Sequence, residues 1–134
     1  MRCQGLSAAP VDPYNPATPQ GGATTMRMML QVVMPIEPAN AAIRSGQFGP
    51  FVQKVLADLK PEAAYFTETD GTRSGYIFFD MKDSADLPAI AEPWFLALNA
   101  TLSVKPAMSA QDLGGPSGAA IEKAVKAYPK TLGS

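Results

Sequence analysis

An Asp-Gly pair between two strand-like runs is the feature that most restricts how this chain of 134 residues can fold. Residues 63–69 (AAYFTET) and 72–81 (TRSGYIFFDM) are rich in aromatic, β-branched and threonine residues, and Asp70-Gly71 separates them. Both central residues of a type I′ turn need a positive φ, which Asp and Gly tolerate, so the sequence predicts a two-residue β-hairpin. Such a turn also determines which side chains lie opposite each other.

The predicted hairpin register can be tested against its side-chain pairs. The pairs are Thr69–Thr72, Glu68–Arg73, Thr67–Ser74, Phe66–Gly75 and Tyr65–Tyr76. They include an opposite-charge pair, a polar pair, an aromatic ring over a glycine and an aromatic pair, and each is a favourable cross-strand combination. We therefore expect this register.

The remaining segments complete a β-α-β-β-α-β order. Residues 26–34 (MRMMLQVVM) predict a buried strand, and apolar residues spaced three and four apart from Phe48 to Leu59 predict an amphipathic helix. A second helix is expected over 84–97 and a half-buried edge strand over 101–105. This order folds most simply as a ferredoxin-like α+β domain, with a four-stranded antiparallel sheet and both helices on one face.

Prolines should shorten or interrupt two of the predicted helical segments. The two prolines that follow the first strand should leave only a short turn over 41–45. Pro93 should kink the second helix or end it before Trp94. Residues 92–95 lie near the end of this helix and could border a pocket mouth. Core packing of Trp94 and Phe95 is the favoured expectation, because large apolar side chains are usually buried.

The chain is expected to have three parts. Residues 1–25 contain few large apolar side chains and are predicted to be a disordered tail. The α+β domain should span 26–113, closing with a turn over 109–113. Residues 114–134 should form a linker and a C-terminal helix over 118–128, which docks on the domain or on a partner chain.

Composition excludes several kinds of site. The chain has no histidine and one cysteine, Cys3, so it can form neither an intramolecular disulfide nor a zinc or haem site from its own His and Cys residues. We expect no metal and no cofactor. The net charge of −1 offers no attraction for nucleic acid, and no apolar run is long enough for a membrane span. A reduced, cytoplasmic protein is the expectation.

The hairpin register also divides the sheet into two faces. Apolar side chains occupy the face toward the helices, whereas the opposite face, called the open face here, mixes aromatic and polar side chains. The open face should carry Met29, Gln31, Val33, Tyr65, Thr67, Tyr76, Phe78, Asp80, Thr101, Ser103 and Lys105. Such a surface usually marks an interface or a ligand site. The candidate ligand-binding residues are Gln31, Tyr65, Tyr76, Phe78, Asp80, Ser103 and Lys105.

Asp80 is the one candidate for a catalytic group. Partial burial beside Phe78 would raise its pKa and suit general acid–base chemistry, whereas a carboxylate that simply ends a strand in solvent is the more common case. Lys105 could orient an anionic substrate, or it could be a solvated lysine that protects an edge strand. Tyr65 and Tyr76 could bind a ligand or fill a dimer interface.

Three stretches of the sequence resemble one known group. They are MMLQVVMP, AAYFTETDGTRSGYIFFDMKDSADLPAIAEPWF and ATLSVKPAM. Together they are similar to the dimeric α+β barrel superfamily, most of all to its small uncharacterised bacterial single-domain members, and more distantly to muconolactone isomerase-like and cofactor-free monooxygenase-like proteins. The resemblance implies a homodimer joined through the open faces, and a pocket between sheet and helices. It assigns no catalytic residue, because members that act on substrates often use a histidine.

Two hypotheses about function follow. The chain could be a homodimeric barrel protein that binds or transforms a small, partly apolar ligand, as an isomerase or cofactor-free oxygenase would. It could instead be a non-catalytic structural or regulatory module that dimerises through its open face. RNA binding is a remote third reading, because residues 73–79 have a passing likeness to an RNA-recognition signature. The acidic balance and the lack of an aromatic residue in the first strand oppose it.

Overall fold

The computed structural model describes residues 24–128 and 130 of the chain. Most of the tail expected over 1–25 therefore lies outside the described residues. Within the described part, no helix is both long and apolar enough to cross a membrane.

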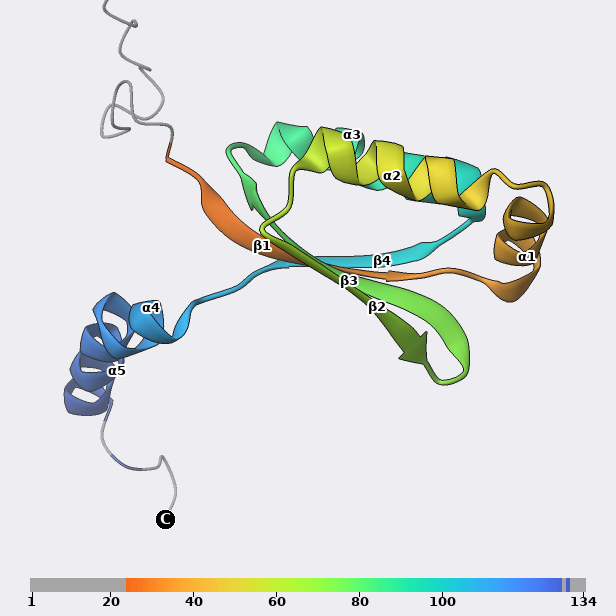
Figure 1. Cartoon of the computed structure of the whole chain (residues 1–134). Helices are drawn as coiled ribbons and strands as arrows, with labels where there is room; N and C mark the ends of the chain where they lie inside the picture. Colours follow the sequence, from red (N-terminus) through yellow and green to blue (C-terminus); the bar gives the residue numbers. More distant parts are fainter. Residues whose placement is uncertain (1–23, 129, 131–134) are drawn as a thin grey trace, which may run out of the picture.

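Four strands form one antiparallel sheet in the order β2-β3-β1-β4 (Figure 1). Their bounds are Met26–Val33 for β1, Ala63–Thr69 for β2, Thr72–Met81 for β3 and Thr101–Pro106 for β4. The two most apolar strands, β1 and β3, occupy the centre, as expected from the sequence. β4 is an edge strand, and it ends at a proline that has no N–H to donate to a further ladder.

The β2–β3 hairpin has the register that the sequence predicts. Tyr65 pairs with Tyr76 and Phe66 pairs with Gly75. Asp70 and Gly71 form the turn with φ values of 52° and 84°. The positive φ values confirm that the Asp-Gly turn chemistry sets the pairing.

Two helices, α2 (Phe48–Leu59) and α3 (Leu87–Leu98), run antiparallel to each other over one face of the sheet (Figure 1). A short 3₁₀ turn, η1 (Ser84–Asp86), leads into α3. The helix α1 (Ile36–Arg44) lies at one end of the sheet, where only a short turn was expected. That expectation was wrong because Pro38 falls in the first turn of α1, where its missing N–H leaves no hydrogen bond unmade.

The helix α3 continues through Pro93 to Leu98, so of the two expected effects of this proline, a kink or an early end, the early end before Trp94 was wrong. Trp94 is 0% exposed and Leu98 1%. Burial of these two large side chains outweighs the hydrogen bond that a proline forfeits inside a helix. Phe95 is 41% exposed, which corrects its expected place in the core. Successive helical residues are turned by about 100°, so the face that buries residues 94 and 98 directs residue 95 elsewhere.

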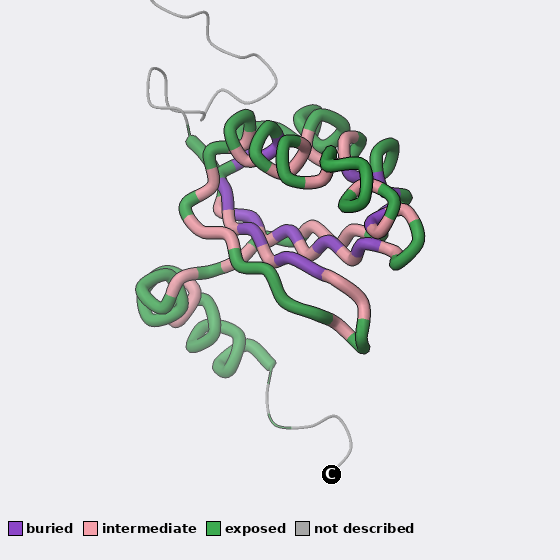
Figure 2. The backbone as a smooth tube through the Cα atoms, turned by 45° about the vertical axis from the view of Figure 1, so that its right-hand side comes forward, coloured by how far each residue is buried: buried purple, intermediate pink, exposed green. Residues whose placement is uncertain are grey.

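The core lies between the sheet and the helices α2 and α3, where Figure 2 shows the buried stretches of the central strands. On the sheet side, alternate residues of β1 and β3 form the core: Met28, Leu30, Val32, Ile77, Phe79 and Met81. On the helix side, the rings of Phe51 in α2 and Trp94 in α3 are in contact, with centroids 5.3 Å apart and an interplanar angle of 89°. Such edge-to-face contacts are favourable between aromatic rings.

The C-terminal part forms two helices, α4 (Ala110–Gly114) and α5 (Pro116–Ala127), beyond the end of the sheet (Figure 1). The expected turn at 109–113 is thus a helix, which starts with a reciprocal capping box between Ser109 and Asp112. No residue of α5 is buried, so the expected docking of this helix on its own domain is not observed.

Candidate functional site

The strand registers gather the predicted ligand-binding residues in neighbouring rows across the open face. One row contains Tyr65, Tyr76, Gln31 and Ser103. The next row contains Ala63, Phe78, Met29 and Lys105. The sheet therefore brings together six of the seven candidates, one or two from each strand. The seventh, Asp80, lies one row further along, opposite Arg27.

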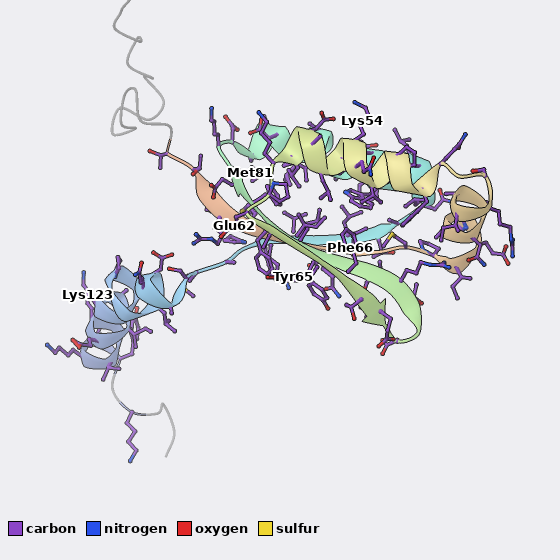
Figure 3. All side chains as sticks on the ribbon, viewed as in Figure 1. Lys54, Glu62, Tyr65, Phe66, Met81 and Lys123 are labelled. Atoms are coloured by element: carbon purple, nitrogen blue, oxygen red, sulfur yellow. The ribbon has the colours of Figure 1, made fainter. Side chains whose placement is uncertain are left out.

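The open face combines hydrogen-bonding groups with exposed aromatic surface. The Nε2 of Gln31 donates to the Oη of Tyr76 at 3.0 Å across the two central strands. Tyr65 is 65% exposed on the side of the sheet away from α2 and α3 (Figure 3). Exposed aromatic groups beside satisfied polar groups suit a protein–protein interface, where tyrosine is enriched.

Asp80 does not have the environment that a catalytic role was expected to give it. Its side chain is exposed in the single chain, and its cross-strand neighbour is Arg27. The partial burial beside Phe78, on which the catalytic hypothesis depended, is therefore absent. The reason is its position one residue before the end of β3, where the open face reaches solvent.

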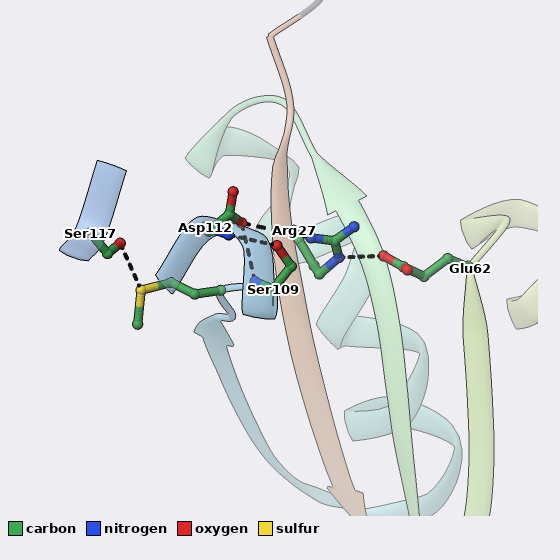
Figure 4. Close-up of polar contacts among 6 residues, drawn as sticks. Arg27, Glu62, Ser109, Asp112 and Ser117 are labelled. Carbon is green, nitrogen blue, oxygen red and sulfur yellow. Dashed lines mark hydrogen bonds and ion pairs between the residues drawn. The ribbon is translucent and has the colours of Figure 1, made fainter. Parts of the chain in front are cut away.

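Arg27 in β1 lies close to two other parts of the chain, Glu62 just before β2 and Asp112 in α4 (Figure 4). Its Nε donates to the Oε1 of Glu62 at 2.6 Å, and its Nη1 lies 4.0 Å from the Oδ2 of Asp112 in α4. The hydrogen bond and the charge of Glu62 raise the pKa of Arg27 above its ordinary value. All three side chains remain well exposed, so solvent screens the ion pairs and their contribution to stability is small. The sequence contains no signal for these long-range pairs.

A cavity of about 370 Å³ lies between α2, α3 and the end of β3. Its apolar wall consists of Phe51, Val55, Leu59, Met81, Ile90 and Pro93. Charged residues also line it: Lys54, whose ammonium group lies 3.4 Å from the carboxylate of Asp58, together with Asp86 and with Asp80, whose side chain belongs to the open face. A wider depression of about 630 Å³ near Arg27 and Asp112 opens more broadly to solvent.

This cavity occupies the place, between sheet and helices, where the resemblance implies a pocket. Among the seven candidate residues, Asp80 is the one that lines it. Pro93 also lines it, and belongs to the stretch 92–95 that could border a pocket mouth. The remaining apolar lining residues were missed because their spacing on each helix is the same signal that marks a packed core. A helix pair that packs tightly and a helix pair that leaves a cavity have the same periodicity in sequence.

The indole of Trp94 is fully buried and is not among the residues that line this cavity. Phe51 and Pro93 do line it, and the Phe51 ring meets the Trp94 ring. Within the described part of the chain, no acceptor is in hydrogen-bonding range of the buried Nε1 of Trp94. An unpaired buried donor costs about 1–3 kcal/mol, and native proteins contain few of them.

The described residues hold no cluster of three or more His, Cys, Asp or Glu side chains with the spacing of a metal site. Compared with protein-family models, with curated proteins and with solved structures, the chain has no significant match. A proposal about function therefore depends on the cavity and on the open face.

Proposed function

We propose that the chain is a homodimeric α+β barrel protein of ferredoxin-like topology, which binds a small, mainly apolar ligand in the cavity between α2 and α3. The observation that carries the proposal is the cavity itself, about 370 Å³ in volume and walled by apolar side chains. Ligand pockets typically measure roughly 300–1,000 Å³ and are lined mainly by hydrophobic side chains.

The charges at the cavity narrow the class of ligand. Two acidic residues, Asp58 and Asp86, and one basic residue, Lys54, line it on the helix side of the sheet. The local excess of negative charge disfavours an anionic ligand, because like charges repel. An uncharged or cationic ligand fits this border better.

The cavity is tested with an uncharged fluorescent probe, N-phenyl-1-naphthylamine, whose emission rises in apolar surroundings. Ala89→Phe places a ring in the cavity border, whereas Ala57→Phe adds the same ring at an exposed position of α2 that does not line the cavity. We expect wild type and Ala57→Phe to bind the probe alike and Ala89→Phe to bind it at least about tenfold more weakly, the factor that 1.4 kcal/mol represents. Equal binding by the two variants, or no binding by wild type, would contradict the ligand site.

The homodimer is supported by the open face. Its rows of tyrosine, phenylalanine and methionine side chains form an uncovered surface on the side of the sheet away from α2 and α3 (Figure 3). Two such faces packed together would bury the aromatic rings and leave each ligand cavity accessible on the outer side.

Sedimentation velocity tests the dimer. Tyr65→Glu introduces a charge on the open face and should shift the protein toward monomer. Leu96→Glu is the control, because Leu96 is 80% exposed on α3, which lies over the other face of the sheet. A wild-type monomer, or a dimer weakened as much by Leu96→Glu as by Tyr65→Glu, would contradict the interface.

The alternative function is a non-catalytic module that only dimerises through this face. A wild-type dimer that binds no probe in the cavity would favour that alternative. If the protein instead transforms its ligand as an isomerase or cofactor-free oxygenase, Asp80 is the candidate general acid or base, and its side chain lies on the open face. Asp80→Asn would then lower turnover while leaving probe binding unchanged.

A further inference from the structure

The strand β2 is the outermost strand on one side of the sheet, and among the described residues no strand pairs with its outer edge (Figure 1). The carbonyl of Arg73 in β3 accepts a hydrogen bond from the N–H of Met34, on the β1 side. In an antiparallel ladder a residue directs its N–H and its C=O to the same side, so Arg73 turns away from β2, and its partner Glu68 turns away from β3. Alternate residues repeat this direction, and the backbone groups of Ala64, Phe66 and Glu68 therefore face the free edge.

The other outermost strand, β4, is protected against pairing, whereas β2 is not. The N–H of Ala107 donates to the carbonyl of Arg27 in β1. The same alternation then places Pro106 at an outward-facing position of β4, where it has no N–H to donate, and Lys105 adds a charge beside it. β2 contains neither proline nor lysine, and Phe66 at its middle is 47% exposed. An unprotected edge with an exposed aromatic side chain is a template for pairing with another strand.

The outward-facing residues of β2 are symmetric about the midpoint of the strand, which is Phe66. Consider a second, antiparallel β2 that is related to the first by a two-fold axis at Phe66. The two Phe66 residues then lie opposite each other, and Glu68 of each strand lies opposite Ala64 of the other. All outward-facing backbone groups of the three residues gain partners, the two aromatic rings become neighbours, and the two Glu68 carboxylates stand at opposite ends of the contact. The edge is thus complementary to itself.

We propose that β2 pairs with β2 of a second copy around a two-fold axis at Phe66, so that one antiparallel sheet continues through both copies. This contact goes beyond the proposed function, because it uses the edge of the sheet and leaves the open face available. It joins two of the open-face dimers into an assembly of four copies. Each copy spends its one unprotected edge in the contact, and β4 is protected, so the assembly closes and does not grow into a fibre.

Amide hydrogen exchange of the full chain tests the pairing, because it reports on single N–H groups. In an unpaired chain the amides of Tyr65 and Thr67 face β3 and exchange slowly, whereas those of Ala64 and Glu68 face solvent and exchange fast. We expect all four amides to exchange slowly in wild type, as pairing between copies requires. Fast exchange of Ala64 and Glu68 in wild type would refute pairing between copies and leave the edge to an extended segment of a different protein.

Two substitutions of one residue test the position of the two-fold axis. Phe66→Lys places two ammonium groups opposite each other at the axis, and Phe66→Glu places two carboxylates there, so each variant alone should lose the contact. An equimolar mixture puts opposite charges at the axis and should restore it. In sedimentation velocity we expect each variant alone to have half the mass of the wild-type assembly and the mixture to have the full mass. The amides of Ala64 and Glu68 should exchange fast in either variant alone.

The same pair of substitutions at Leu96, which is 80% exposed on α3, is the control and should leave the mass unchanged. Variants of Phe66 that assemble like wild type would contradict the edge contact, and a mixture that keeps half the mass would contradict the two-fold axis at Phe66. If the open-face dimer is wrong but the edge contact is right, wild type is a dimer and each Phe66 variant a monomer. Should the Phe66 variants fail to fold, amide exchange in wild type decides.

Discussion

The ring of Phe66 lies directly over Gly75, its cross-strand partner. A Cβ atom built on Gly75 would stand 2.9 Å from both the Cδ1 and the Cε1 of Phe66, and 3.4 Å from a methyl carbon of Val32. The glycine at this position is therefore required by packing, and the contact holds Phe66 on the helix side of the sheet (Figure 3).

Gly75→Ala should destabilise the protein by about 1 kcal/mol or more, because the added methyl group forces the Phe66 ring aside. Gly49→Ala is the matched control: a Cβ there meets nothing within 4 Å, and alanine is favoured over glycine in a helix by roughly 0.5–1 kcal/mol. Urea denaturation measures both. Phe66→Leu should recover part of the loss in the Gly75→Ala background, and strictly additive effects of the two substitutions would show that the contact is not the cause.

Leu98→Ala and Leu96→Ala test how α3 is anchored. Leu98 is buried in the core and Leu96 is exposed. The first substitution should cost about 2–5 kcal/mol, as buried leucines do, and the second should stay within about 0.5 kcal/mol. Thermal and chemical unfolding curves of the two variants measure the difference. Similar decreases in the free energy of unfolding would contradict the burial of Leu98 in the core.

Pro93→Ala should stabilise the protein, because it restores an N–H that can complete the helical ladder of α3. An interior proline costs a helix up to about 3 kcal/mol, so we expect a gain of about 1–3 kcal/mol. Pro88→Ala is the control: Pro88 lies in the first turn, where a missing N–H costs little. An unchanged or lower unfolding free energy for Pro93→Ala would show that the proline is needed to shape the cavity wall.

The cap of α4 should weaken in acid. Hydrogen bonds from the backbone N–H and side chain of Ser109 lower the pKa of Asp112 below its ordinary value. Since the folded pKa lies below the unfolded one, the stabilisation is complete above the unfolded pKa and is lost as the pH falls through the lowered folded value. A ¹³C NMR titration of the Asp112 carboxyl follows this change.

Ser109→Ala removes the side-chain partner and leaves the backbone donor. The pKa of Asp112 should therefore rise toward its ordinary value without reaching it. Ser117→Ala is the control, because the hydroxyl of Ser117 donates to the sulfur of Met108 and does not contact Asp112 (Figure 4). The expected cap would be contradicted if the two substitutions moved the Asp112 titration equally.

The elements that the sequence predicts correctly are those with a local cause. The Asp70-Gly71 turn sets the hairpin register, and the register places Tyr65, Tyr76 and Gln31 in one row. The errors arose where the rule that proline breaks a helix did not hold. Pro38 falls in the first turn of α1, and α3 continues through Pro93 because Trp94 is buried. The effect of a proline depends on its position within the helix, and so does the set of side chains that the helix buries. Both therefore depend on where the helix starts, and local sequence patterns locate helix starts poorly.

The sequence by itself determined the order of the four strands and of the two helices that cover them, the pairing of the hairpin and the two unlike faces of the sheet, because turn chemistry and side-chain alternation act over a few residues. The tertiary structure alone decided the cavity between α2 and α3, the exposed position of Asp80 and the unpaired donor of Trp94. These features depend on how far apart two packed helices lie and on which atoms meet between them. Periodicity specifies which face of a helix is apolar, but not whether that face is filled.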